Sequence, residues 1–271
     1  MATHGNLHYS NSNPARVLVL TDSRGDGLDL VLDDYIQRNN LPVEVELQIA
    51  RGAKIQRLLH IAVKEARHNH YDKIIIQGGI CNFTTREAIG DIKLLSYYRG
   101  SQIAKVLSVI EELRQHFGSR VNIATIVPAS LKKYYTHHLK TIDPSAEYTL
   151  LSLKGQQKKL LEDIKLVNGQ IVEGNKNLGI RTIDLDRQVL GQSVKKRKNK
   201  KKSKAVKIFK DHHLCDGVHP SEFLANKLHH RTCESLFRDL GLYIPAAPPQ
   251  ETEESDSQSS DNSDFWDFKR Q

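Results

Sequence analysis

Five short runs of apolar residues, separated by amphipathic segments, organise the first 240 residues of the chain. They cover residues 16–20, 43–49, 71–76, 121–127 and 180–185. The run at 43–49 alternates apolar and polar side chains, which is typical of a strand with one exposed face. The run at 71–76 contains three consecutive isoleucines, which indicates a strand buried on both faces. We therefore predict five β-strands.

The segments between these runs repeat their apolar side chains every three or four residues, as the buried face of a helix does. In residues 26–39 these positions are Leu28, Val31, Leu32, Tyr35 and Ile36. Helices are likewise predicted over residues 55–66, 101–117 and 221–240, and one long or two consecutive helices over 146–177. Alternating strands and helices at this spacing predict an α/β fold, in which helices cover both faces of a mostly parallel sheet.

Both ends of the chain differ in composition from the middle. Residues 1–14 are polar and are predicted to be a disordered lead, whereas residues 243–271 are predicted to be a disordered acidic tail rich in Pro and Ser. Residues 15–242 then form one domain. The stretch after the third strand, up to about Tyr98, is interpreted as a linking segment.

The formal net charge is +8, but it is concentrated in one tract. Lys195–Lys204 contains eight basic residues and no acidic one, so the rest of the chain sums to 8 − 8 = 0. We expect this tract to be an insertion loop between the fifth strand and the last helix. Such a tract is usually just solvated, but its charge density also suits nucleic acid or a nuclear import receptor as a partner.

Other sequence features bear on the environment of the protein. Its three cysteines, Cys81, Cys215 and Cys233, are too few and too scattered for a disulfide framework or a zinc knuckle. The N-terminal residues lack the apolar core of a signal peptide, and no apolar run reaches the length of a membrane span. We expect an intracellular protein, cytoplasmic or nuclear, with no metal and no cofactor.

Ser23 follows the first predicted strand, at the edge where open α/β sheets bind their ligands. A serine nucleophile needs a base for its hydroxyl group and an orienting group for that base. Asp216 and His219, three residues apart across a glycine, can supply both from one turn. A lone serine of this kind is more often an N-cap, and Asp216 can also cap the last helix. The catalytic interpretation of Ser23, Asp216 and His219 therefore rests on their combination.

Ester hydrolysis also needs N–H donors for the negative charge that develops on the attacked carbonyl oxygen. The backbone N–H of Ser23 is one candidate. Gly52, in the turn after the second strand, can bring its N–H close to a ligand because it has no Cβ. The third candidate is the side-chain amide of Asn82 after the third strand, which is equally well explained as an Asx-turn former.

Four short motifs resemble, in order and content, the four sequence blocks of the SGNH (GDSL-like) hydrolase family. They are TDS at 21–23, RGA at 51–53, GGICN at 78–82 and DGVHP at 216–220. The resemblance covers about residues 16–240 and implies a flavodoxin-like, three-layer α/β/α sandwich, here with five mostly parallel strands. It also implies that Ser23 is the nucleophile, Asp216 and His219 are the acid and base, and Ser23, Gly52 and Asn82 form the oxyanion hole.

The chain departs from the family pattern in two of these blocks. Thr21 stands where the family usually has glycine before Asp-Ser, which predicts a tighter nucleophile turn. The third block usually reads Gly-x-Asn-Asp, whereas here two residues separate Gly79 from Asn82, and Phe83 replaces the Asp. The second departure decides whether Asn82 reaches the oxyanion.

Two functions follow from this pattern. The first is a serine esterase that forms an acyl-enzyme with a small-molecule, glycan or lipid ester, including acetylated substrates. The second is an SGNH-like interaction module that has lost catalysis, of the kind carried by some mobile elements and viruses, and that associates with nucleic acid through Lys195–Lys204. The sequence does not select the substrate.

Overall fold

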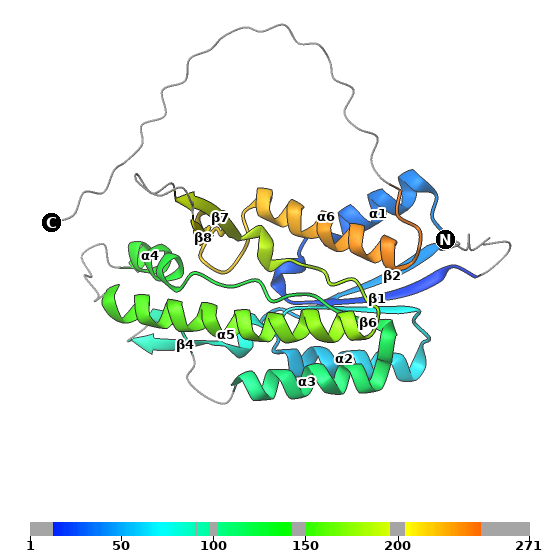
Figure 1. The fold of residues 1–271 in the computed structure, drawn as a ribbon, viewed down its shortest axis with the longest axis horizontal. Helices are drawn as coiled ribbons and strands as arrows, with labels where there is room; N and C mark the ends of the chain where they lie inside the picture. The colour runs from blue at the N-terminus through cyan, green and yellow to red at the C-terminus, as the bar shows by residue number, and fades with distance from the viewer. Residues whose placement is uncertain (1–12, 90–91, 98–101, 143–149, 196–203, 245–271) are drawn as a thin grey trace, which may run out of the picture.

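The structure, a computed structural model, describes residues 13–89, 92–97, 102–142, 150–195 and 204–244 (Figure 1). Most of the predicted lead, the interior of the basic tract and most of the predicted tail lie outside these residues. Among the described residues, no helix combines the length and the apolar character that a membrane span requires.

A four-stranded parallel sheet forms the centre of the fold. Its strands are β1 (Ala15–Thr21), β2 (Val43–Ile49), β3 (Lys73–Gln77) and β6 (Val121–Ile123), in the order β2-β1-β3-β6. The α-helices in the described part of the chain are α1 (Leu28–Asn39), α2 (Ile55–His68), α3 (Gln102–Phe117), α4 (Leu131–Ile142), α5 (Leu150–Asn177) and α6 (Glu222–Asp239). The predicted α/β class and parallel sheet are confirmed.

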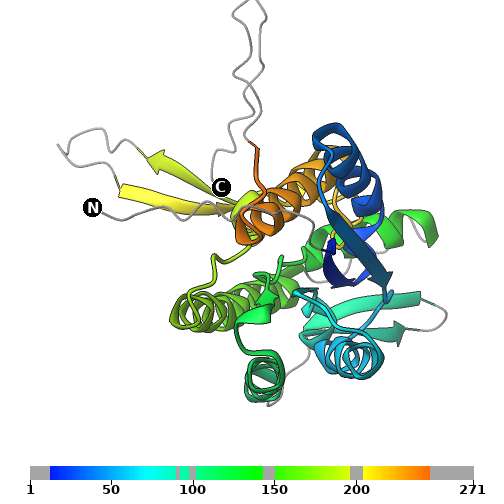
Figure 2. The ribbon, with the colours of Figure 1, turned by 90° about the vertical axis from the view of Figure 1, so that its right-hand side faces the viewer.

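The sheet separates two apolar cores, which gives the molecule three layers (Figures 1 and 2). Successive side chains of a strand point to opposite faces. Leu18 and Leu20 of β1 accordingly contact the layer of α2, α3 and α5, whereas Val17 and Val19 contact α1 and α6. All four side chains are fully buried, which explains the uninterrupted apolar run in this central strand.

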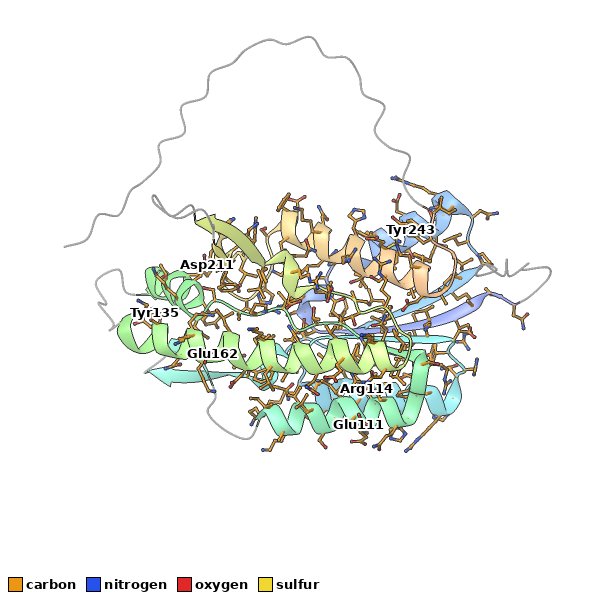
Figure 3. All side chains as sticks on the ribbon, in the orientation of Figure 1. Glu111, Arg114, Tyr135, Glu162, Asp211 and Tyr243 are labelled. Atoms are coloured by element: carbon orange, nitrogen blue, oxygen red, sulfur yellow. The ribbon has the colours of Figure 1, made fainter. Side chains whose placement is uncertain are left out.

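Helices α3 and α5 are joined by a partly buried arginine. Arg114 of α3 points toward α5, where its guanidinium donates to the carbonyl oxygens of Gln170 and Ile171 at 3.3 and 3.1 Å (Figure 3). The guanidinium lies over Gly174, in space that a side chain at this position would occupy. The glycine within α5 thus lets the two helices approach.

The prediction of a fifth strand at 180–185 is wrong. The Thr125 N–H donates to the Ile183 carbonyl oxygen at 3.0 Å, but the Thr125 hydroxyl then accepts the N–H groups of Leu185 and Asp186. The Thr125 side chain therefore takes the place of the backbone hydrogen bonds that a fifth strand would form with β6. The segment remains buried at Ile183 and Leu185, which accounts for its strand-like pattern.

The predicted strand at 121–127 ends early for a similar reason. Beyond Ile123 the backbone pairs with side chains of α5: Asn175 donates to the Ile123 carbonyl, and Asn168 binds both the N–H and the C=O of Ile126. Polar side chains seven residues apart share one face of a helix. They take the place of a neighbouring strand along this chain.

Two antiparallel hairpins lie outside the main sheet, and neither was expected. β4 (Thr84–Ile89) pairs with β5 (Ile92–Tyr97) within the predicted linking segment, and β5 packs against α4 and α5. β7 (Leu190–Lys195) pairs with β8 (Lys204–Phe209) on either side of the basic tract and projects from the body (Figure 2). Helix α4 was also not predicted, and 150–177 is one long helix.

Replacing Asn168 with alanine should destabilise the protein by about 2 kcal/mol or more, because the buried N–H and C=O of Ile126 would lose their partner. Urea unfolding followed by circular dichroism measures this loss. The exposed Asn177 on the same helix provides a matched control, and Asn177→Ala should change stability by no more than about 0.5 kcal/mol. Equal stabilities for the two variants would contradict the role of Asn168 in holding the backbone of Ile126.

Candidate active site

The loop before α6 forms a closed turn that fixes Asp216 and His219. Leu214 and Pro220 form an isolated antiparallel bridge, and the Cys215 N–H donates to the His219 carbonyl at 2.7 Å. Gly217 has φ +90°, and a Cβ on it would overlap the backbone at the start of α4. Both conditions demand glycine at this position.

Inside this turn one carboxylate binds three donors. Oδ1 of Asp216 accepts the N–H groups of Val218 and His219 at 2.8 and 2.7 Å, and Oδ2 lies 2.8 Å from Nδ1 of His219. The cap of α6 is the Ser221 hydroxyl, which accepts the Leu224 N–H. Asp216 is therefore free of the capping role that its position suggested, and it fixes the imidazole ring instead.

The hydroxyl of Ser23 lies 3.1 Å from Nε2 of His219, on the opposite side of the ring from Asp216. Ser23 begins the short 3₁₀ helix η1 (Ser23–Gly25) directly after β1. The N-cap of η1 is Asp22, whose Oδ1 accepts the Arg24 N–H at 3.0 Å. The cap role that a lone Asp-Ser suggests belongs to the aspartate, which leaves the serine hydroxyl to the imidazole.

The protonation states of the pair depend on this contact. Burial alone would raise the pKa of Asp216, but hydrogen bonds from the ring and backbone of His219 and from the Val218 N–H outweigh it, so the pKa lies well below its ordinary value. The hydrogen bond to Asp216 raises the pKa of His219 against a smaller opposing effect of burial. His219 therefore holds a proton more strongly than a free imidazole.

Arg24, which sequence reasoning did not single out, ties the two halves of the site together. The residue is only 5% exposed, and its Nε donates to the Val218 carbonyl at 3.1 Å while Nη1 donates to the Val127 carbonyl. Burial lowers the pKa of the guanidinium, which the nearby carboxylate of Asp22 partly offsets. The side chain fixes the loop of His219 relative to the turn of Ser23.

Thr21 and Gly25 accommodate each other at the end of β1. A Cβ on Gly25 would overlap three atoms of the Thr21 side chain, so the threonine fills space that any other residue at 25 would need. The residue that departs from the family pattern is thus matched by a glycine four positions later. Because Gly25 belongs to η1, this contact sets how closely the turn that carries Ser23 folds over the strand.

The other two predicted oxyanion donors lie at the same edge of the sheet. Thr21 and Ile49 are partners in the β1–β2 ladder, and Gly52 follows with φ +68° on an exposed turn. Asn82 is buried: its Oδ1 accepts the Ile55 N–H at 2.9 Å, and its Nδ2 donates to Oε1 of Gln56 at 2.8 Å. The Asn82 side chain therefore holds the first turn of α2 beside Gly52.

The described residues contain no cluster of three or more His, Cys, Asp or Glu side chains that could hold a metal ion. Cys81 is partly buried, Cys215 is exposed and Cys233 is buried, and none of the three forms a disulfide within the described residues. The functional groups that the described residues bring together at this site are the Ser23 hydroxyl, the His219 imidazole and the Asp216 carboxylate.

Solved structures similar to this fold are lipases and esterases. The lipase/acylhydrolase from Enterococcus faecalis has a TM-score of 0.52 and 16% identity, over 86% of this chain and 100% of that one. A GDSL-like lipase from Bacteroides thetaiotaomicron has a TM-score of 0.51 and 12% identity, over 85% of this chain and 91% of that one. The esterase EstA from Pseudoalteromonas sp., in a structure inhibited by monoethylphosphonate, has a TM-score of 0.50 and 12% identity, over 85% and 100%.

No protein-family model and no curated protein sequence matches the chain. At identities of this order the structural likeness establishes the fold. The chain has the α/β/α fold of the SGNH (GDSL-like) hydrolases, with four strands in its central sheet.

Replacing Asp216 with asparagine should lower the pKa of His219 below its wild-type value, because the hydrogen bond that stabilises the imidazolium is lost while burial still opposes charge. In the wild-type protein the pKa should lie above the ordinary 6.5. NMR titration of the imidazole, assigned with His219→Gln, measures both values. The exposed Asp33→Asn on α1 removes the same charge and should leave the pKa unchanged; an unaltered pKa in Asp216→Asn would contradict the contact.

Gly25→Ala should destabilise the protein by about 1–3 kcal/mol, because the added methyl group overlaps Thr21. Combining it with Thr21→Gly should remove most of that extra cost, giving a coupling energy in a double-mutant cycle measured by urea unfolding. Gly155→Ala on α5 is the control, since a Cβ there meets nothing within 4 Å, and it should not destabilise. Additive effects at 21 and 25 would count against the contact.

Proposed function

We propose that the protein is a serine esterase of the SGNH type that cleaves esters through an acyl-enzyme. The observation that carries the proposal is the row from Ser23 Oγ through His219 to Asp216, with contacts of 3.1 and 2.8 Å. A nucleophile, a base and an orienting carboxylate in this order are the arrangement that acyl transfer by serine requires. The esterases and lipases that share the fold support the same chemistry.

In the first half of the reaction Ser23 Oγ attacks the ester carbonyl carbon as Nε2 of His219 accepts the hydroxyl proton. The tetrahedral intermediate collapses to an acyl–serine ester, and His219 returns the proton to the departing alcohol. In the second half a water molecule attacks the acyl group, His219 accepts its proton, and the acid leaves as Ser23 regains its hydrogen. Asp216 stays ionised and stabilises the imidazolium in both halves.

Three N–H donors are proposed for the oxyanion. The Ser23 N–H heads η1 and has no acceptor within that turn, and the Gly52 N–H lies on the adjacent turn. The Asn82 amide carries two hydrogens, of which Gln56 takes one, so the second is the donor in this proposal. Losing one such donor typically costs about 10²–10³-fold in kcat.

The proposed substrates are small-molecule esters, with glycan and lipid esters and acetyl groups among them. The Ser23–His219 contact is open to solvent on one side, since the His219 side chain is 42% exposed, so a substrate carbonyl can reach the hydroxyl. Because His219 must be neutral to act as base, its raised pKa shifts the acid limb of the activity profile above pH 6.5.

A second candidate is an interaction module that associates with nucleic acid. The β7–β8 ladder places Lys195 opposite Lys204, so the two ends of the basic tract meet on one hairpin that projects from the body. Phosphate contacts of this kind weaken steeply with salt. Salt-dependent binding of a DNA duplex that is lost when residues 195–204 are neutralised, together with an unreactive Ser23, would favour this candidate over the esterase.

Ser23→Ala should reduce hydrolysis of 4-nitrophenyl acetate roughly 10³-fold or more and abolish labelling by a fluorophosphonate, because both reactions use the activated hydroxyl. Steady-state kinetics and mass mapping of the labelled peptide measure this. Ser119→Ala, at an exposed site in the turn after α3, should retain full activity. Equal turnover by Ser23→Ala and wild type, or labelling elsewhere than Ser23, would remove the esterase proposal.

A further inference from the structure

A cavity of about 540 Å³ opens beside the proposed oxyanion hole, between the first turns of α2 and α3. It is lined by Gly52, Lys54, Gln56, Arg57, Gln102 and Lys105. These residues come from the turn after β2 and from two helices that lie side by side on one face of the sheet (Figures 1 and 2).

The described lining of this cavity carries positive charge and no negative charge. Lys54, Arg57 and Lys105 supply three cations, Gln56 and Gln102 supply neutral amides, and the described lining contains no carboxylate. No salt bridge neutralises these cations within the described part of the chain, whereas the neighbouring Arg51 pairs with Asp26 at 3.0 Å. Clustered cations without counterions attract an anionic ligand group such as a carboxylate or a phosphate.

The cavity borders the proposed catalytic machinery through Gly52 and Gln56. Gly52 belongs both to its wall and to the proposed oxyanion hole, and Gln56 in the same wall accepts a hydrogen bond from Asn82. The β1–β2 ladder pairs Thr21 with Ile49, so the turn with Ser23 and the turn with Gly52 leave the sheet side by side. An anion held among the three cations can therefore belong to the same molecule as an ester carbonyl at Ser23.

We propose that this cavity selects esters that carry a carboxylate or a phosphate group, on either the acyl or the alcohol part. The inference rests on the proposed esterase function and names its substrate class. Lys54, Arg57 and Lys105 bind the anionic group, while the carbonyl lies between Ser23 and the oxyanion donors.

Two pairs of matched esters test the preference, one for each part of the substrate. Mono-4-nitrophenyl adipate against 4-nitrophenyl hexanoate places the anion on the acyl part, and 4-acetoxybenzoate against 4-acetoxybenzamide places it on the alcohol part. At low ionic strength, kcat/KM in one of the pairs should be about tenfold or more higher for the anionic ester. The preference should shrink as NaCl is added, because salt screens exposed charges.

A triple variant locates the preference in the cavity. Lys54→Gln, Arg57→Gln and Lys105→Gln together should reduce the anionic-to-neutral ratio to near one, with kcat/KM on the neutral ester within about twofold of wild type. The control removes the same net charge elsewhere, through Lys64→Gln, Arg67→Gln and Lys176→Gln at exposed positions outside the lining, and should keep the preference. A preference that survives in the cavity variant, or is lost equally in the control, would overturn the inference.

A binding measurement separates failure of this inference from failure of the esterase proposal. Calorimetric titration of Ser23→Ala protein with adipate and with inorganic phosphate, at constant ionic strength, needs no turnover. Binding that disappears in the cavity variant supports the anion site even if no ester is hydrolysed, and the absence of binding by both anions overturns it. Hydrolysis of neutral esters with no anionic preference would leave the esterase standing and reject the substrate class.

Discussion

The site depends on one buried guanidinium. Arg24 donates to carbonyl groups 103 and 194 residues further along the chain, on Val127 and Val218, and its own carbonyl lies 3.3 Å from Nε2 of His229 on α6. Burying a charge is costly unless it is paired and hydrogen-bonded, and the planar fork of an arginine can bind acceptors in several directions at once. Because Arg24 follows Ser23 directly, the residue that fixes the turn of Ser23 also fixes the loop of His219.

The parallel sheet decides where the candidate site lies, and side chains decide its geometry. The carboxyl ends of β1, β2 and β3 bring Ser23, Gly52 and Asn82 to one edge without any specific contact between them. The short distances between the side chains of the site come from local hydrogen bonds. Asp216, for example, binds three donors within its own turn. The same division holds beyond β6, where amide side chains of α5 replace a strand.

This division explains what could be predicted from the sequence. The strands and the neighbouring helices could be predicted because their apolar residues repeat with a regular period. The Asp216–His219 pair could be predicted because the two residues are close in sequence. Arg24 was not, since a basic residue in a polar turn is usually solvated and its burial depends on two distant carbonyl groups. The apolar run at 180–185 correctly predicted that this segment is buried. Burial alone, however, does not distinguish a β-strand from an extended segment whose backbone is hydrogen-bonded by the Thr125 side chain.

The departures from the family motif are each compensated locally. Thr21 packs on Gly25, and Phe83, which stands where the family has an aspartate, is fully buried in the core shared by α2, α3 and α5. Arg24, which follows Ser23, has its charge bound by the carbonyl groups of Val127 and Val218. Taken one position at a time, Thr21 and Phe83 are mismatches to the family pattern. Within the fold, however, Thr21 is matched by Gly25, and Phe83 is matched by its apolar neighbours in the core.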